Sequence, residues 1–199
     1  MLLLLAIMIG LLTERAHQLI REVVNSGDGA IDATTGNGHD TLFLARLVGP
    51  QGKVFAADIQ NQALQSARLH LKHEENTAPV EWVLAGHETM AQWLPRKYRG
   101  HIKAIMFNLG YLPGGDKTII TRSDTTLSAL EQSCQVLAPG GRITMIAYTG
   151  HPGGTEEARQ IRHWLETLNP NQYHWHCETP NHRRHPPQLF VVDKKPETV

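Results

Sequence analysis

Two hydrophobic periodicities alternate along the chain. Over residues 14–25, apolar side chains recur at the spacing of one helix face, which is typical of an amphipathic helix. Short apolar runs bounded by glycine, proline or asparagine are typical of buried strands. We therefore predict helices over residues 14–25, 41–48, 61–73, 125–137 and 156–168, and strands over 30–33, 54–57, 80–84, 102–107, 143–147, 172–177 and 189–192.

Strands that alternate with helices predict an α/β fold, with a mostly parallel sheet covered by helices on both faces. Only the stretch ETPNHRRHPPQ separates the last two strands, which favours an antiparallel hairpin at one edge of the sheet. The chain shows no internal repeat and no long linker, so we expect residues 14–199 to form a single domain.

Residues 1–13 form a separate hydrophobic lead-in, MLLLLAIMIGLLT. A membrane-spanning helix needs about 20 apolar residues, and this run ends too early. A secretory signal has a basic start and a small-residue cleavage site, and neither is evident here. We expect the lead-in to pack on the domain or to be added by an upstream start codon, without stable membrane insertion; membrane association is the alternative.

The composition is that of a folded, electrically balanced protein. Of 199 residues, 41% are hydrophobic, and 19 basic side chains face 19 acidic ones. This balance excludes disorder and argues against a broad basic face, so any RNA contact must come from a local cluster, and DNA is not expected. Cys134 and Cys177 form neither a CxxC pair nor a disulfide framework, which favours a reducing, cytoplasmic location.

A glycine-rich turn, DATTGNGHDT at residues 32–41, joins the first strand to the next helix. Glycines there let the backbone approach a ligand. Asp58 ends the second strand 20 residues after Gly38, the distance typical of an acid that binds a ribose. However, position 41 is threonine, where a dinucleotide fold has its third glycine, and Asp32 would repel a pyrophosphate. An adenosine cofactor with an ammonium group, such as S-adenosylmethionine, fits better.

At this point the chain resembles the class I S-adenosylmethionine-dependent methyltransferases over residues 14–194. The motif of two apolar residues followed by acid-x-x-x-Gly-x-Gly matches residues 30–38. The resemblance implies a Rossmann-like, seven-stranded fold and S-adenosylmethionine as the cofactor. The cofactor-binding residues that we expect are Asp32, Thr34, Gly36, Asn37, Gly38, Asp40, Thr41, Asp58, Gln60, Gly86, His87 and Asn108.

After the fourth strand comes NLGYLPGGD, at residues 108–116. In class I methyltransferases this position faces the transferred methyl group, and amino-directed members often carry Asn/Asp-Pro-Pro-Tyr/Phe there. This chain keeps Asn108 and Tyr111 but replaces both prolines. A carboxamide oxygen can accept an N–H bond from an amine and so aim its lone pair, while Tyr111 can stack on a base.

Together, DATTGNGHDTLFLA, NLGYLPGGD, YTGHPGG and the late Pro-Pro resemble a small family long labelled as rRNA methylases. That family is similar to the tRNA methyltransferases that complete 5-methylaminomethyluridine at the wobble position. The resemblance implies methyl transfer to the amine of 5-aminomethyl(-2-thio)uridine in tRNA. It does not extend to the leading MLLLLAIMIG. A small-molecule amine methyltransferase and a non-catalytic module that binds S-adenosylmethionine are the alternatives.

An alkylamine has a pKa of about 10 and must lose a proton before it attacks. Asp116, His151 and Tyr148 are polar neighbours that can take it, although a desolvated site alone also lowers the pKa of the amine. The choice stays open, and we expect Asn108, Tyr111 and Asp116 to be the catalytic residues.

The predicted final hairpin loop lies on the ligand side of the sheet. Arg183 and Arg184 there, together with His151, are the candidate RNA-binding residues. The basic residues between positions 96 and 103 precede the fourth strand, and we expect them to be solvated. Histidines gather after residue 150, but their spacing around Cys177 matches no common zinc pattern, so no metal is expected. A homodimer is compatible with the sequence.

Overall fold

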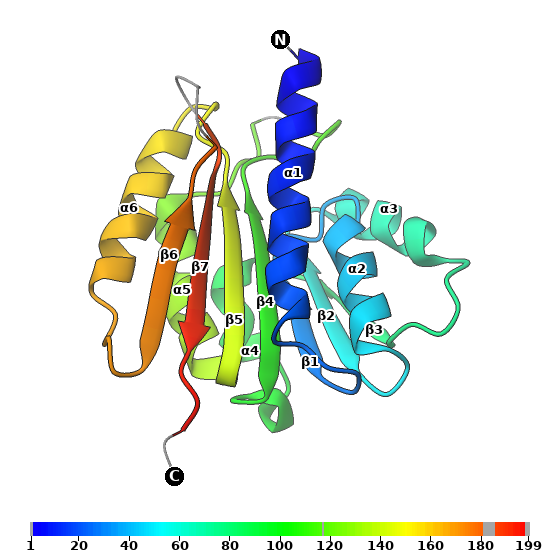
Figure 1. Cartoon of the computed structure of the whole chain (residues 1–199). Coiled ribbons are helices and arrows are strands. Elements are labelled where there is room, and N and C mark those ends of the chain that lie inside the picture. The colour runs from blue at the N-terminus through cyan, green and yellow to red at the C-terminus, as the bar shows by residue number, and fades with distance from the viewer. Residues whose placement is uncertain (1, 117, 181–185, 198–199) are drawn as a thin grey trace.

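The computed structural model describes residues 2–116, 118–180 and 186–197. A seven-stranded sheet lies between two layers of helices (Figure 1). In chain order the elements are α1 (Leu2–Arg21), β1 (Gly29–Asp32), α2 (His39–Val48), β2 (Lys53–Asp58), α3 (Asn61–Leu71), β3 (Val80–Leu84), η1 (His87–Thr89), α4 (Met90–Trp93), η2 (Arg96–Tyr98), β4 (Ile102–Leu109), α5 (Ser123–Val136), β5 (Leu137–Ala147), α6 (Gly154–Glu166), β6 (Tyr173–Glu178) and β7 (Gln188–Lys194).

The strand order is β3-β2-β1-β4-β5-β7-β6. The first five strands pair in parallel, and β7 pairs antiparallel with both β5 and β6. This arrangement confirms the predicted α/β fold and its antiparallel end. The chain winds outward from β1 in one direction and from β4 in the other, so the switch point between these strands opens a crevice at their carboxyl ends.

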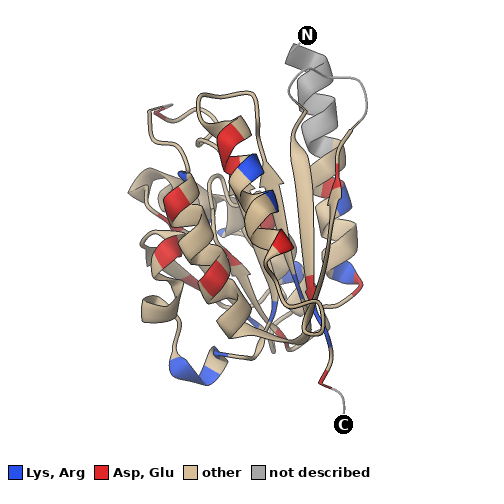
Figure 2. Cartoon of the chain, turned by 90° about the vertical axis from the view of Figure 1, so that its left-hand side faces the viewer, with Lys and Arg blue, Asp and Glu red and all other residues tan. Residues whose placement is uncertain are grey.

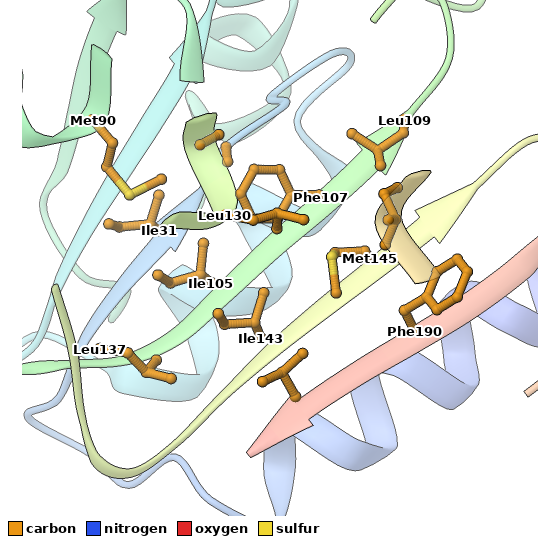
Figure 3. Close-up of a cluster of buried hydrophobic side chains, with 14 of the residues drawn as sticks. Ile31, Met90, Ile105, Phe107, Leu109, Leu130, Leu137, Ile143, Met145 and Phe190 are labelled. Carbon is orange, nitrogen blue, oxygen red and sulfur yellow. The ribbon is translucent and has the colours of Figure 1, made fainter. Parts of the chain in front are cut away.

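Alternate side chains of the central strands pack on opposite faces of the sheet, as the period of two requires. On β4, Phe107 and Ile105 belong to a core under α5 and α6, which Figure 3 shows together with Phe190 of β7. Met106 of the same strand belongs to the second core, under α1 and α2. The sheet is therefore fixed from both sides, and its carboxyl edge is a rigid base for a site.

The first helix differs from the prediction at both ends. It begins at Leu2 instead of residue 14 and ends at Arg21 instead of residue 25. The buried face of this helix includes Leu12 as well as Ala16, so it extends beyond the predicted start. Glu14 does not interrupt the helix, because glutamate is a good helix former. Within the described residues no helix is long and apolar enough to cross a membrane.

Two further differences concern the start of β5 and the segment between β3 and β4. Strand β5 begins at Leu137, six residues before the predicted start, because it pairs with β4 across a register shift. The short helices η1, α4 and η2 were not predicted, since three or four residues are too few to show a helical period.

The charges of the helices agree with the balanced composition. On α6, the helix nearest the viewer in Figure 2, acidic and basic residues lie along the same helix, whereas α5 carries acidic residues without basic ones. On α6, for example, Arg159 is paired with Glu156 at 2.6 Å.

Candidate active site

A cavity of about 760 Å³ opens at the carboxyl ends of the parallel strands. Its wall comes from the segments that follow β1, β2, β3, β4 and β5, and from one face of α1. This volume is in the range of sites for drug-sized ligands. The site thus lies where the switch point of the sheet predicts it.

The glycine-rich turn is tied to the acid at the end of β2. The backbone N–H of Gly36 donates to one oxygen of the Asp58 carboxylate at 2.9 Å, and that of Gln60 donates to the other at 2.8 Å. Gly36 has a φ of +51°, which favours glycine. Each Asp58 oxygen keeps a lone pair for a further donor, so this carboxylate can still accept hydroxyl groups of a ligand.

Three residues predicted to bind the cofactor do not line the cavity: Asp32, Gly38 and Thr41. Asp32 is fully buried and accepts hydrogen bonds from the Thr41 hydroxyl at 2.5 Å and the Thr34 N–H at 3.2 Å. Burial, and secondarily the nearby Asp40 carboxylate, raises the pKa of Asp32 to about 7. Asp32 therefore joins the end of β1 to the start of α2 instead of facing a ligand.

Gly38 has a comparable internal role. A Cβ atom at this position would lie 2.7 Å from the Cβ of Ala67 on α3, so the absence of a side chain lets the turn pack against that helix. The other cofactor candidates do line the cavity: Thr34, Gly36, Asn37, Asp40, Asp58, Gln60, Gly86, His87 and Asn108.

His87 follows β3 and carries an unused polar atom. Its imidazole is buried against Phe107, with ring centres 5.8 Å apart. Within the described residues its Nε2 is buried without a hydrogen-bond partner. Burial lowers the pKa of His87, which favours the neutral imidazole. Because an unpaired buried polar atom is costly, this nitrogen suits a polar group of a bound molecule.

Asn108 is the centre of a polar chain at the end of β4. Its backbone N–H donates to the Thr34 hydroxyl at 2.7 Å, and its side-chain NH₂ donates to the Asp40 carboxylate. The Tyr148 hydroxyl lies 3.4 Å from the carboxamide oxygen of Asn108. Asp40 also contacts Nε2 of His17, at 2.6 Å. Burial, with the Asp40 charge, raises the pKa of Tyr148 to about 12, so its hydroxyl stays protonated.

Tyr111 and His151 line the same cavity, in the segments that follow β4 and β5. Tyr111 is 41% exposed, and its ring stands edge-on to that of His151 with centres 6.1 Å apart. Nδ1 of His151 lies 3.0 Å from the Pro152 carbonyl oxygen, while Nε2 is buried and has no partner among the described residues.

The remaining predicted site residues lie elsewhere. Asp116 does not line the cavity; its carboxylate accepts bonds from the N–H and the hydroxyl of Thr118, at 2.8 and 2.7 Å, and these bonds lower its pKa. The structure thus gives Asp116 a turn-forming role. Arg183 and Arg184 lie outside the described residues. In the described ranges, no three His, Cys, Asp or Glu side chains are grouped as a metal site.

Sequence reasoning missed the contribution of α1. Thr13, Glu14 and His17 all line the cavity, although they belong to a helix that precedes the glycine-rich turn. It also missed Glu157 of α6, which is 2% exposed and accepts bonds from the hydroxyls of Thr121 and Thr126 at 2.9 and 2.7 Å. The one sequence signal for His17 was its own position, as a polar residue beside the apolar face of the predicted helix, and that signal is weak.

Comparison with known proteins adds a family and several relatives. Residues 54–193 match the family model described as "Putative rRNA methylase". The chain is 44% identical, over 75% of its length, to the chloroplastic tRNA (mnm(5)s(2)U34)-methyltransferase of Arabidopsis thaliana. It spans about half the length of the curated relatives that it matches, 57% in the Arabidopsis protein.

Two crystal structures share almost the whole fold. One is a "putative rRNA-methylase" from Clostridium thermocellum, with 36% identity and a TM-score of 0.85 over 92% of this chain and 96% of that one. The other is a "putative methyltransferase" from Streptococcus mutans in complex with SAH, with 33% identity and a TM-score of 0.79 over 92% and 97% of the two chains.

Proposed function

The chain belongs to the rRNA methylase family of class I S-adenosylmethionine-dependent methyltransferases, and on that premise we propose that it methylates an amine on RNA. The substrate we propose is the aminomethyl group of 5-aminomethyl(-2-thio)uridine at the wobble position of tRNA. The observation that carries the proposal is the oriented carboxamide of Asn108, on the wall of a cavity that also holds the glycine-rich turn and Asp58.

The volume of the cavity and its polar groups suit S-adenosylmethionine. The Asp58 carboxylate keeps acceptor capacity for the ribose hydroxyls, and Nε2 of His87, which has no partner among the described residues, can bond a polar atom of the adenine. The segment from Thr34 to Asn37 also lines the cavity. When bound, this cofactor supplies an electrophilic methyl group. The chain's own residues orient the amine and remove its proton.

Asn108 orients the amine. Its NH₂ group is committed to Asp40, so its carboxamide oxygen is the atom left to accept an N–H bond from the substrate. Holding the amine by one N–H directs the nitrogen lone pair, and correct positioning alone supplies a large part of such a rate enhancement.

Among the three groups considered for proton removal, His151 fits best. The raised pKa of Tyr148 keeps that hydroxyl protonated at neutral pH, and Asp116 lies away from the cavity. Nδ1 of His151 faces a carbonyl oxygen and must donate there, so Nε2 of the neutral ring is an acceptor.

Exposed apolar side chains at the cavity support a nucleotide substrate. Tyr111, Ile59 and Ile119 line the cavity and are 41%, 57% and 37% exposed, so they offer surfaces on which a base can stack.

The tRNA assignment also draws on the similarity to the Arabidopsis enzyme. Arg183 and Arg184 stay candidates for phosphate contacts. A cytoplasmic location and a homodimer stay predictions, and the name of the Arabidopsis relative places that protein in the chloroplast.

The test is methyl transfer to tRNA that carries the 5-aminomethyl group but lacks the final methyl. The protein is incubated with this tRNA and methyl-labelled S-adenosylmethionine, and the nucleosides are then separated. Label in 5-methylaminomethyl(-2-thio)uridine is the expected result. An unmodified tRNA transcript and a free alkylamine are the matched controls. Label in the free amine alone would favour a small-molecule methyltransferase, and cofactor binding without turnover on any substrate would favour the non-catalytic module.

A further inference from the structure

His17 is held tightly, although it belongs to none of the segments that follow the strands. Its imidazole stacks face to face on Phe43 of α2, with ring centres 3.7 Å apart and planes inclined by 6°. Its Nε2 lies 2.6 Å from the Asp40 carboxylate, and its side chain is only 12% exposed. Stacking fixes the ring plane and the hydrogen bond fixes the rotation, so one orientation of the imidazole is selected.

Asp40 in turn determines which way the Asn108 carboxamide faces. A carboxylate can only accept hydrogen bonds. The end of Asn108 that meets Asp40 must therefore be the NH₂ group, and the carboxamide oxygen must point to the other side, toward Tyr148. The amide could rotate by half a turn only if Asp40 moved away or lost its charge.

The two oxygens of Asp40 are divided between these partners. One contacts His17 and the other accepts from Asn108. Asp40 is 5% exposed, so removal of the His17 contact would leave a buried carboxylate with less than its full set of bonds. Such a group rotates toward water or another donor, and its hold on Asn108 weakens.

We propose that His17 is a positioning residue for methyl transfer, which acts through Asp40 to keep the carboxamide oxygen of Asn108 available to the substrate amine. The proposal rests on the proposed function for its kinetic consequence, but the chain of contacts from His17 to Asn108 can be tested without turnover. Residues 13–17 lie outside the part of the chain that matches the family model, which begins at residue 54.

Two substitutions separate the hydrogen bond from the stacking. His17→Phe keeps an aromatic ring on Phe43 but removes the donor to Asp40, whereas His17→Gln restores an N–H donor at a similar reach. Gln18→Ala changes the neighbouring exposed position of α1 and serves as the control. In single-turnover methylation of undermodified tRNA, we expect His17→Phe to lower the rate by about 10- to 100-fold with little change in KM, and His17→Gln to restore most of it.

Two further measurements make the result decisive. The side-chain NH₂ resonances of Asn108, assigned with Asn108→Ala, should shift in His17→Phe and return toward their original positions in His17→Gln. Calorimetry should give nearly unchanged affinity for S-adenosylmethionine in all three variants. A wild-type rate in His17→Phe, unmoved Asn108 resonances, or a loss confined to cofactor affinity would overturn the proposal. Wild-type protein that methylates no tRNA, with the resonance shift intact, would refute the proposed function but leave the positioning role standing.

Discussion

Gly38→Ala should destabilise the protein strongly, although only one methyl group is added. The backbone at Gly38 has a φ of +83°, and a Cβ atom there would lie 2.7 Å from the Cβ and 2.8 Å from the Cα of Ala67. A left-handed conformation costs an L-residue about 1–2 kcal/mol, and overpacking of this kind costs about 1–3 kcal/mol more. The expected loss is therefore about 2–5 kcal/mol in the free energy of unfolding.

Gly27→Ala is the matched control for the backbone part of this loss. Gly27 has a φ of +94°, and a Cβ atom there would meet nothing within 4 Å, so only the first contribution applies. Urea unfolding of both variants isolates the packing against Ala67 as the difference between them. Equal losses in the two variants would refute the reasoning. If Gly38→Ala instead had wild-type stability but bound the cofactor more weakly, the result would support the ligand contact that we expected from the sequence.

Three further predictions concern the cavity and its support. Asp58→Ala removes the acceptor of two loop N–H groups and of the ribose; calorimetry should show affinity for S-adenosylmethionine weaker by about 1.5–3 kcal/mol, and an unchanged Kd would exclude Asp58 from the cofactor site. Tyr111→Ala should raise KM for tRNA by the equivalent of about 1–3 kcal/mol through lost stacking, while Tyr111→Phe stays near wild type; equal effects would argue for the hydroxyl instead. Burial raises the pKa of Asp32 from 3.8 to about 7. Between these pH values the folded state therefore binds more protons than the unfolded state. The contribution of Asp32 to the free energy of unfolding is thus lost as the pH rises through 7. The side chain of the Asp32→Asn variant cannot titrate. When the free energy of unfolding is measured from pH 4 to 8, the variant should therefore gain stability relative to wild type as the pH rises. Parallel pH curves for the two proteins would contradict the raised pKa of Asp32.

The strands were predictable because burial on both faces leaves a direct trace in the sequence. All seven predicted strands overlap an observed one, and the final pair is antiparallel as expected. Only β5 began far from its predicted start, because the APGG stretch is typical of a helix end and the pairing of Leu137 with Ile102 depends on a register shift. Register is a property of two strands together, and one segment does not encode it.

The site was predictable as a place but not as a set of contacts. Spacing along βαβ units indicates which turns meet at the carboxyl edge, and for this reason nine of the cofactor candidates, among them Thr34, Asp58 and Asn108, line one cavity. Spacing does not say which side of a turn faces inward, so Asp32 and Gly38 were assigned to a ligand when they serve the protein interior. His17 carried only a weak signal, because its contact with Asp40 depends on how α1 packs against the sheet and α2.

The structure also determines the sign of a pH effect at Asn108. In Asn108→Asp, a carboxylate replaces the NH₂ group that donates to Asp40, and two carboxylates in contact are held together only when they share a proton. The shared proton raises the pKa of one of them. As the pH rises and this proton is lost, the two groups repel each other, the oriented oxygen is lost, and the added charge favours the protonated amine.

The rate of Asn108→Asp relative to wild type should therefore fall as the pH increases from about 5.5 to 8.5 in single-turnover assays on undermodified tRNA. Asn108→Ala carries no titrating group, so its lower rate should keep a constant ratio to wild type across the same range. Without the Asp40 contact the opposite trend would be expected, because a lone carboxylate facing an ammonium group weakens its inhibition when the amine deprotonates at high pH. A relative rate that rises with pH would thus show that Asp40 and residue 108 do not act as a pair.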